Sequence, residues 1–430
     1  MEGQWEVTDK RVSVIGLGYA GLPLALAFAR AGILTVGIDI SEEKVNLLKN
    51  GKSYLTDVND DQVRQVQDLF QPTTDYAAVE GSTAVIICVP TPVKEAGEPD
   101  VSAVINAGER LGPFVKRGML IVLQSTTFPG TTEEILRPIL ERRSGLQAGQ
   151  DFCLAYSPER IDPGNKEYNL TNTPKLVGGC ASCCSERAKR LFENIVTKAP
   201  IYILTSPRVA EAAKLFENTF RFINIALVNE LAYICRALGI SVWEVLDAAA
   251  TKPFGFTKFT PGPGAGGHCI PVDPLYLLWN GRRFNQESRF IQLAHEINNA
   301  MPHIIVNIVA DVLNERGLPV RDRTFLILGV AYKPDVNDPR HSPALPIMDL
   351  LMRKKGIVFY HDPFIDKISF NSWTAESVPL SQELLHSCDC VIIVTPHSCY
   401  DWRWIVDNAR LVVDTRGVTR HLMAKNVVLL

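Results

Sequence analysis

The stretch Val12-Ser13-Val14-Ile15-Gly16-Leu17-Gly18-Tyr19-Ala20-Gly21 decides the fold, and an apolar run from Leu22 to Ala31 follows it. The first four residues predict a strand, and the apolar run predicts a helix. In a Gly-x-Gly-x-x-Gly turn, the glycines permit a tight turn, close approach of a pyrophosphate and close helix–strand packing. The helix N-terminus offers unpaired N–H groups to phosphates. A purely structural glycine turn is the alternative. The expected dinucleotide site comprises Gly16, Leu17, Gly18, Tyr19, Ala20 and Gly21.

An acidic residue stands at the expected distance after this turn. The second predicted strand, Thr35 to Ile40, reaches Asp39 near its end. A carboxylate there accepts hydrogen bonds from ribose hydroxyls and repels a 2′-phosphate, so we predict NAD rather than NADP as the cofactor. Lys44 follows one turn into the next helix. It either lies near the same ribose or is a solvated surface lysine.

Strands and helices alternate in both halves of the chain, which predicts an α/β fold with parallel sheets covered on both faces. The N-terminal half adds three predicted strands: 84–89, 120–124 and 152–156. The C-terminal half has four predicted strands and one helix: 324–329, 357–360, 390–395 and 411–414, with the helix at 347–355.

The middle of the chain is helical. Apolar residues recur at helical spacing from Pro207 to Leu238, and a second helical pattern runs from about Phe290 to Arg316. The first helix is long enough to join domains, and its surplus apolar positions predict a homodimer interface. We therefore expect two Rossmann-like doubly wound domains, residues 1–206 and 318–430, joined by a long central helix and a helical middle domain, residues 207–317.

Composition excludes several classes of function. The 430 residues carry a formal net charge of −3, which argues against general binding to nucleic acid or anionic membranes. Mixed charges between Met1 and Arg11 do not form a signal peptide, and Pro23 and Arg30 interrupt the most apolar early stretch. A cytoplasmic protein without a membrane span is expected.

The ten cysteines are scattered and are expected to be reduced. Cys180-x-x-Cys183-Cys184 has spacing known from redox and zinc sites, but no second pair at metal-ligand spacing lies nearby in the sequence. We therefore predict a structural role for these cysteines and no metal.

Two loops follow predicted strands, where ligands of open α/β sheets bind. Thr91 lies between two prolines after the strand 84–89, and Thr126 follows the strand 120–124. Both are predicted to contact the cofactor, and the Thr126 hydroxyl is a candidate for holding the nicotinamide or a catalytic water. The alternative is a helix cap that leads into Glu133 and Glu134.

A glycine-rich loop, Gly262 to Gly267, ends in His268 and Cys269, and Asp273 follows it. Most cysteines are buried packing residues. The flanking glycines and Pro271 instead favour an exposed nucleophile. Adjacent side chains usually diverge, so we do not expect His268 to act as the base for Cys269.

Lys214 and Asn218 stand four residues apart in the long helix and therefore share a face. A cation and an amide projecting together can stabilise an oxyanion. The alternative is a solvated surface pair, which the apolar character of the surrounding helix disfavours.

Taken in chain order, these motifs resemble the UDP-glucose/GDP-mannose dehydrogenase family over nearly the whole chain. Besides the glycine turn and the Cys269 loop, the resemblance rests on Ser125-Thr126, 157–165 (Ser-Pro-Glu-Arg-Ile-Asp-Pro-Gly-Asn), Lys214 with Asn218, 332–343 (Tyr-Lys-Pro-Asp-Val-Asn-Asp-Pro-Arg-His-Ser-Pro) and Asp414-Thr415-Arg416. Segments 157–165 and 252–257 are most similar to the branch that oxidises UDP-N-acetylglucosamine at C6.

The resemblance implies a four-electron oxidation of a primary alcohol to a carboxylate, with two NAD used in succession, for polysaccharide precursor synthesis. Cys269 would form a thiohemiacetal and then a thioester. A nucleophile is needed because an aldehyde has no second hydride to give until it becomes tetrahedral.

The resemblance also implies roles for the remaining residues. The oxyanions would be stabilised by Lys214 and Asn218, and Asp273 would orient water or accept a proton. Hydrolytic water would be positioned by Thr126 and Glu159. Arg340 would lie near the cofactor, and the UDP-sugar would be held by Glu159, Arg160, Lys214, Asn218, Gly262, Gly266, Lys333 and Arg416.

Several alternatives stay open from the sequence. The substrate could be UDP-glucose or a UDP-N-acetylmannosamine or UDP-N-acetylgalactosamine epimer. Other classes are a two-electron hydroxyacid dehydrogenase, which needs no Cys269, and a non-catalytic NAD-binding protein. The yield of NADH per substrate separates these classes: two, one or none.

Overall fold

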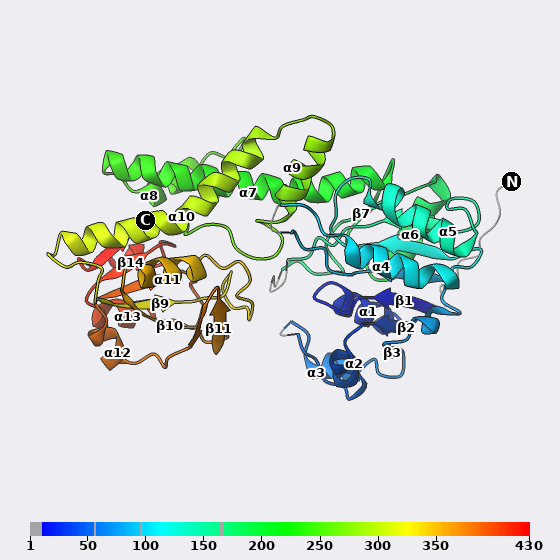
Figure 1. Cartoon of the computed structure of the whole chain (residues 1–430), viewed down its shortest axis with the longest axis horizontal. Coiled ribbons are helices and arrows are strands. Elements are labelled where there is room, and N and C mark those ends of the chain that lie inside the picture. The colour runs from blue at the N-terminus through cyan, green and yellow to red at the C-terminus, as the bar shows by residue number, and fades with distance from the viewer. Residues whose placement is uncertain (1–10, 56, 95–96, 163–164, 166) are drawn as a thin grey trace. The chain divides into compact units, whose positions relative to one another are not determined.

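The computed structural model describes residues 11–55, 57–94, 97–162, 165 and 167–430 (Figure 1). The expectation about the first ten residues therefore lies outside the described residues, as do Pro163 and Gly164 of the 157–165 motif. The chain divides into two compact units. The first ends at Glu217 and also includes Leu275–Gln286, and the second comprises Asn218–Pro274 and Glu287–Leu430.

The first unit is built on an eight-stranded sheet with the order β3-β2-β1-β4-β5-β6-β7-β8. The strands are β1 (Arg11–Ile15), β2 (Leu34–Ile38), β3 (Phe70–Thr73), β4 (Ala84–Ile87), β5 (Leu120–Leu123), β6 (Cys153–Tyr156), β7 (Lys175–Gly179) and β8 (Ile201–Leu204). All neighbours pair in parallel except β6 and β7.

The prediction of a parallel sheet is thus wrong at one pair. No helix lies between β6 and β7 among the described residues. A parallel pairing needs a crossover that returns the chain to the starting edge, usually a helix, whereas this connection returns the chain antiparallel.

Helices cover both faces of this sheet, as expected for a doubly wound fold. One core packs α1 and α6 against the sheet, and the other packs α4 and α5 against the opposite face. The helices of this region are α1 (Gly21–Arg30), α2 (Glu42–Lys49), α3 (Asp60–Arg64), α4 (Ser102–Leu111), α5 (Arg137–Ser144) and α6 (Ser182–Glu193). Every residue of the short strands β4 and β5 is buried, because helices cover both faces of the sheet. Polar groups are therefore found in the loops at the carboxyl ends of the strands.

The second unit holds a smaller parallel sheet with the order β10-β9-β13-β14-β15. Its strands are β9 (Thr324–Leu328), β10 (Ile357–His361), β13 (Cys390–Ile393), β14 (Val412–Asp414) and β15 (Val427–Leu429), and a hairpin adds β11 (Lys367–Phe370) and β12 (Trp373–Glu376). One face packs against α10 (Arg289–Asn314) and α11 (Ala344–Arg353). The other packs against α12 (Gln382–Ser387) and α13 (Trp402–Asn408). Two Rossmann-type sheets, each covered on both faces, confirm the predicted fold class.

The helical middle contains α7 (Pro207–Leu238), α8 (Val242–Ala249) and α9 (Asp273–Arg283), besides α10. The long helix runs over the predicted residues, and α10 agrees within two residues with the second helical pattern. Within the described ranges, none of the helices has the length and apolar character needed to cross a bilayer.

Sequence patterning missed β3, β7, β8, β15 and the β11–β12 hairpin. β3, β8 and β15 lie at sheet edges, where one side of the ladder is open. β3 and β12 mix polar and apolar residues and carry no continuous apolar run. The apolar runs of β8 and β15 are only four and three residues long and are not fully buried, so length and burial give them little signal.

Candidate active site

The glycine turn after β1 has the geometry that the sequence predicts. Gly16 has a φ of +90°, and a Cβ there would lie 2.6 Å from the carbonyl oxygen of Cys88. A Cβ on Gly21 would lie 1.8 Å from the carbonyl oxygen of Gly16, so only glycine allows α1 to start there. At Gly18 a Cβ would meet nothing within 4 Å. The open side at Gly18 fits the close approach of a pyrophosphate, so this turn fits NAD.

Asp39 follows β2 and binds the glycine turn. Its Oδ2 accepts from the Leu17 N–H at 2.9 Å, and its Oδ1 accepts from the Ser41 N–H at 3.0 Å. The Lys44 Nζ lies 3.8 Å from Asp39 Oδ2 and 5.4 Å from the centre of the Tyr54 ring. Lys44 is therefore beside the predicted ribose-binding carboxylate, while its side chain stays 40% exposed. Tyr54, which the sequence analysis missed, donates to the Leu17 carbonyl.

The loops after β4 and β5 are joined by hydrogen bonds. The Thr91 Oγ1 donates to the Thr126 carbonyl at 2.5 Å, and Thr126 is half-buried. The Tyr276 hydroxyl donates to the Thr91 carbonyl. Thr126 caps no helix, because the next helical turn begins after Gly130, whose φ is +105°. The helix-cap alternative is therefore wrong, and Thr126 stands at the carboxyl edge of the sheet.

A buried acid on α7 holds the turn that follows Thr126. Glu211 accepts from the Gly130 N–H at 2.6 Å, and from the Thr132 N–H and Oγ1 at 2.9 and 2.6 Å. Burial raises the pKa of Glu211 to about 7 against these hydrogen bonds. The sequence analysis did not select Glu211, because one acid among many in an amphipathic helix carries no signal of its own.

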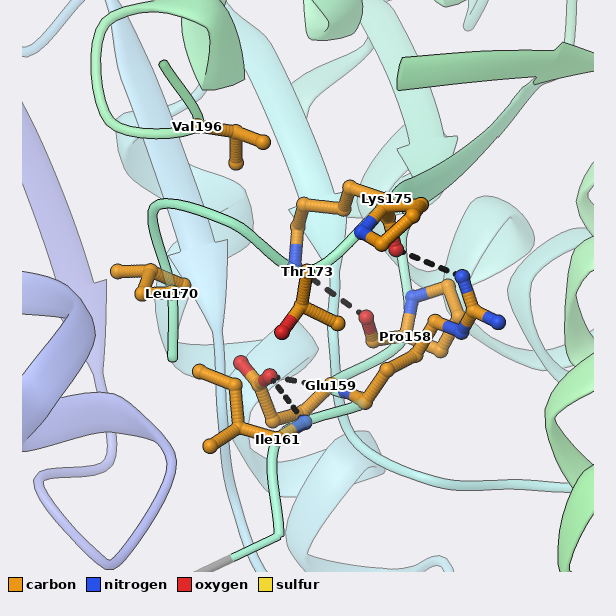
Figure 2. Close-up of a pocket in the computed structure, with 9 residues that line it drawn as sticks. Pro158, Glu159, Ile161, Leu170, Thr173, Lys175 and Val196 are labelled. Carbon is orange, nitrogen blue, oxygen red and sulfur yellow. Dashed lines mark hydrogen bonds between the residues drawn. The ribbon is translucent and has the colours of Figure 1, made fainter. Parts of the chain in front are cut away.

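Glu159 lies in a narrow pocket after β6 (Figure 2). Its Oε2 accepts from Gln124 Nε2 at 2.8 Å, and its Oε1 accepts from the Arg160 and Ile161 N–H groups at 2.8 and 3.0 Å. Apolar side chains of Ile161, Leu170 and Val196 also line the pocket. The carboxylate is held from two sides, which suits a group that must position a water molecule.

Arg160 also lines this pocket, and its guanidinium pairs with an acid on α7. Its Nη2 lies 2.8 Å from Glu217 Oε1, its Nε donates to Glu217 Oε2, and its Nη1 donates to the Pro174 carbonyl at 2.6 Å. One edge of the guanidinium therefore pairs with an acid of the same unit.

Lys175 completes the pocket and was also missed. Its side chain is buried, its Nζ donates to the Pro158 carbonyl at 3.2 Å, and it lies 4.6 Å from the centre of the Phe192 ring. Desolvation lowers the pKa of Lys175, and the nearby Glu159 carboxylate opposes that shift.

Lys214 and Asn218 lie one turn apart on α7, as predicted. The Lys214 side chain is buried, which disfavours the solvated-pair alternative. Asn218 Nδ2 donates to Asp273 Oδ2, and Asp273 is itself buried at the first turn of α9. The structure thus brings together two residues that the sequence analysis selected 55 positions apart.

Cys269 lies one turn before Asp273. Its carbonyl accepts from the Val272 and Asp273 N–H groups at 3.1 and 2.8 Å, which forms the turn that starts α9. The thiol is partly exposed, as a nucleophile must be.

The glycine loop before Cys269 packs against the loop after β9. Gly267 has a φ of +88°, and a Cβ there would lie 2.8 Å from the Tyr332 ring. A Cβ on Gly266 would lie 3.0 Å from the His341 carbonyl oxygen. Glycines here serve close backbone packing as well as the predicted approach to a ligand.

Gly262 is held between a guanidinium and a buried amide. A Cβ on Gly262 would lie 2.4 Å from Arg416 Nη1. The Gly262 N–H donates to Asn229 Oδ1 at 2.9 Å, and Asn229 Nδ2 donates to Asn298 Oδ1 at 3.0 Å. Both asparagines are buried and were missed, because their role depends on α7 meeting α10. Desolvation lowers the pKa of Arg416 to about 10, so the guanidinium remains charged at neutral pH.

Arg340, predicted to contact the cofactor, forms a fork with Asp338. Its Nε lies 2.9 Å from Asp338 Oδ1 and its Nη2 lies 2.6 Å from Asp338 Oδ2. Although burial opposes it, these hydrogen bonds lower the pKa of Asp338. The Arg340 carbonyl accepts from the Gly267 N–H at 3.2 Å, and its Nη2 lies 3.2 Å from His268 Nδ1. Arg340 and His268 therefore belong to one cluster that supports the Cys269 loop.

Lys333 follows β9 at the carboxyl edge of the second sheet, and Arg416 follows β14 at the same edge. This is the edge where ligands bind in open α/β sheets. Behind the loop, His397 Nε2 lies 3.0 Å from Asp362, whose Oδ2 accepts from the Val330 N–H at 2.7 Å. The buried pair fixes the loop that carries Lys333.

Comparison with known proteins matches three regions of the chain to one family. Residues 10–196 match the NAD binding domain of the UDP-glucose/GDP-mannose dehydrogenase family, residues 208–300 its central domain and residues 326–421 its UDP binding domain.

Individual relatives are similar over almost the full length. A UDP-N-acetyl-D-mannosamine dehydrogenase of Pyrococcus horikoshii is 33% identical, with 96% of both chains covered. A UDP-N-acetyl-D-glucosamine 6-dehydrogenase of Salmonella typhi is 34% identical, with 91% of both chains covered. A solved structure of the UDP-D-ManNAc dehydrogenase from Pyrococcus horikoshii superposes with a TM-score of 0.87 at 32% identity, covering 95% of each chain.

With a dinucleotide turn on one sheet and cations at the carboxyl edge of the other, the chain is an NAD-dependent oxidoreductase. It belongs to the UDP-glucose/GDP-mannose dehydrogenase family, and its substrates are UDP-sugars.

Proposed function

We propose that the chain oxidises the C6 hydroxyl of a UDP-N-acetylhexosamine to the carboxylate, with UDP-N-acetylglucosamine as the preferred substrate. The observation that carries this proposal is the group Cys269, Asp273 and Asn218: a partly exposed thiol one turn before a buried acid that accepts from an amide. A two-electron hydroxyacid dehydrogenase has no use for this thiol.

The reaction consumes two NAD, each of which accepts one hydride when bound at the glycine turn. The first oxidation leaves an aldehyde at C6. The Cys269 sulfur adds to this aldehyde and gives a thiohemiacetal, whose carbon again bears a transferable hydrogen. Its oxidation leaves a thioester, and water cleaves the C–S bond to give the carboxylate and the thiol.

The remaining residues stabilise charge and hold water. Lys214 and Asn218 would stabilise the alkoxide and the tetrahedral oxyanions. The carboxylate of Asp273 would keep the Asn218 amide oriented. For hydrolysis, Glu159 and Thr126 would position the water, and the bond from Gln124 to Glu159 supports this role.

UDP binding is proposed for the second unit. The N–H groups of the 262–266 loop, Lys333 and Arg416 offer the donors and positive charge that a pyrophosphate requires. As a second proposal, Arg340 lies near the cofactor. Its two hydrogen bonds to Asp338 would then hold the guanidinium in a fixed orientation towards the cofactor. The proposed product is a uronic acid for polysaccharide synthesis.

The preference for an acetamido sugar rests on sequence similarity. Segments 157–165 and 252–257 resemble the acetamido-sugar branch, and the Salmonella typhi relative is named for UDP-N-acetyl-D-glucosamine. The Pyrococcus horikoshii relative, named for the mannosamine epimer, keeps that epimer as the second candidate.

The deciding experiment counts NADH per UDP-sugar consumed by the wild-type protein and by Cys269→Ala. The wild type is expected to give two NADH and the uronate, and Cys269→Ala no uronate. Cys399→Ala, which removes an exposed cysteine elsewhere, serves as the matched control. Near-normal uronate formation by Cys269→Ala would overturn the covalent mechanism, and one NADH per sugar from the wild type would indicate a two-electron enzyme.

A further inference from the structure

Three cysteines outside the proposed catalytic groups converge in the first unit. Cys153 is the first residue of β6, and Cys183 and Cys184 lie in the first turn of α6. The three Sγ atoms all lie within 4.8 Å of one another. Cys153 and Cys184 are buried, and Cys183 is exposed.

This cluster is not the one that the sequence spacing suggested. Cys180, the first cysteine of the Cys-x-x-Cys pattern, is outside the group of three, and Cys153 from the preceding strand is inside it. The spacing of Cys180, Cys183 and Cys184 gives no indication of Cys153, because Cys153 reaches the cluster only through the packing of α6 on the sheet.

The spacing of the sulfur atoms suits one shared metal ion. Zinc–sulfur bonds are about 2.3 Å long, so three sulfurs around one ion lie about 4 Å apart. Sulfurs within 4.8 Å reach that distance by shifts of less than about 1 Å, which rotation about χ1 supplies. Thiolate ligands select soft d10 cations such as Zn²⁺ and Cu⁺ over magnesium or calcium.

One arginine lies beside the cluster, and close packing and a hydrogen bond hold the turn that carries two of its cysteines. The Arg187 side chain contacts Cys153 and is anchored by a hydrogen bond from its Nη2 to the Thr83 carbonyl at 3.2 Å. The N-terminal turn of α6 adds a favourable dipole for thiolates. A Cβ on Gly179 would lie 2.8 Å from the Cβ of Cys184, and the Gly179 N–H donates to Ser185 Oγ at 2.8 Å. The ligand-bearing turn is thus fixed against β7.

We propose that Cys153, Cys183 and Cys184 bind one soft d10 cation, Zn²⁺ or Cu⁺, through their three sulfur atoms. Because Cys183 is exposed, the ion can enter the site from solvent beside it. The fourth coordination position of the ion would face solvent. The site lies at the amino end of β6, whereas Ser157 and Glu159 follow its carboxyl end. Cys153 and Ser157 are four residues apart, about 13 Å along an extended strand.

Binding is tested on the full-length protein, reduced with a non-chelating phosphine and stripped of metal. Zn²⁺ and Cu⁺ are titrated separately against a chromophoric chelator, and Co²⁺ serves as a spectroscopic probe of thiolate ligation. We expect one ion per chain, proton release on binding and a sulfur-to-cobalt charge-transfer band. The cation that keeps its stoichiometry against the stronger chelator is the preferred one.

Variants separate this site from other thiols. Cys183→Ser, at an exposed position, is expected to weaken binding at least tenfold, and Cys184→Ala to abolish it. Cys269→Ser and Cys399→Ser are expected to leave the stoichiometry and the charge-transfer band unchanged. The proposal is overturned if binding survives Cys183→Ser and Cys184→Ala, if it is lost with Cys269→Ser, or if the three cysteines form only a disulfide on peroxide treatment and retain no metal.

Discussion

Asp39 shows at the residue scale how one side chain joins a local motif to a choice of cofactor. Its carboxylate accepts hydrogen bonds from the N–H groups of Leu17 and Ser41, and its Oδ2 lies 3.8 Å from the Lys44 Nζ. The carboxylate thus holds the glycine turn, and we predict that it faces the ribose of the cofactor, where it would repel a 2′-phosphate more than Lys44 could offset.

We predict that NAD is used far better than NADP, and that Asp39→Asn lowers the ratio of kcat/KM for NAD over NADP at least tenfold. The substitution removes the charge and keeps the size of the side chain, and one tenfold change corresponds to about 1.4 kcal/mol. Steady-state kinetics with both cofactors provide the test. Glu42→Gln, which removes an exposed acid from the first turn of α2, is the control. Comparable kcat/KM for both cofactors in the wild type would contradict the placement of Asp39 at the ribose.

Glu211 predicts a pH dependence of stability, because burial raises its pKa in the folded state to about 7. A carboxyl group with a raised folded pKa contributes stability that is complete below its unfolded pKa of about 4.3. That contribution is lost as pH rises through about 7, and it amounts to at most about 4 kcal/mol.

The melting temperature of the wild type, taken relative to Glu211→Gln, should therefore fall between pH 5 and pH 8. Glu193→Gln, which removes an exposed partner of Lys189 on α6, should not change that pH trend. If the difference in melting temperature between the wild type and Glu211→Gln stays constant over this pH range, the raised pKa of buried Glu211 is contradicted.

At the scale of elements, the part of α7 that belongs to the second unit, 218–238, carries apolar side chains that this unit does not cover. In the second unit, Phe220, Leu227, Ile234 and Leu238 are 47, 58, 52 and 66% exposed. Their spacings of seven, seven and four residues place them on one side of the helix. A face of this kind is typical of an interface between copies of a chain.

We predict that the protein is a homodimer through this face of α7 and that Leu227→Glu raises the dimer dissociation constant at least tenfold. Sedimentation at micromolar concentration measures the effect. Arg236→Glu also adds negative charge to the exposed surface of α7, but nine residues from Leu227 and hence about half a turn away around the helix, and it should leave the dimer intact. A monomeric wild type would contradict the prediction.

Periodicity predicted the long buried elements and failed at sheet edges. The continuous apolar runs of β4 and β5, the mostly apolar β1 before its glycine turn, and the helical spacing of α7 were sufficient. The antiparallel β7 was not predictable, because its orientation depends on the path of 157–174 and not on local preference.

At the scale of the whole molecule, the residues that we propose to bind the UDP-sugar come from segments far apart in the sequence. We predict a kcat/KM for UDP-N-acetylglucosamine at least about tenfold above that for UDP-glucose, because a pocket built to hydrogen-bond an acetamido group leaves polar atoms unpaired with a hydroxyl. Steady-state rates with UDP-glucose, UDP-N-acetylglucosamine, UDP-N-acetylgalactosamine and UDP-N-acetylmannosamine test this. UDP-glucose as the best substrate would refute the acetamido preference and leave the Cys269 mechanism standing.

The sequence by itself determined the fold class, the glycine turn with Asp39, and the selection of Cys269, Asp273, Lys214 and Asn218. These follow from local rules. Glycine stands where a side chain would collide, an acid follows the end of a strand, and residues four positions apart share one face of a helix. Only the tertiary structure decided which residues meet. In the folded chain Arg160 pairs with Glu217, and Lys175 is buried beside Glu159. Asn229 donates a hydrogen bond to Asn298, and Cys153 lies beside Cys183 and Cys184. These contacts arise when helices pack on sheets, and packing brings together side chains whose separation along the chain carries no local signal.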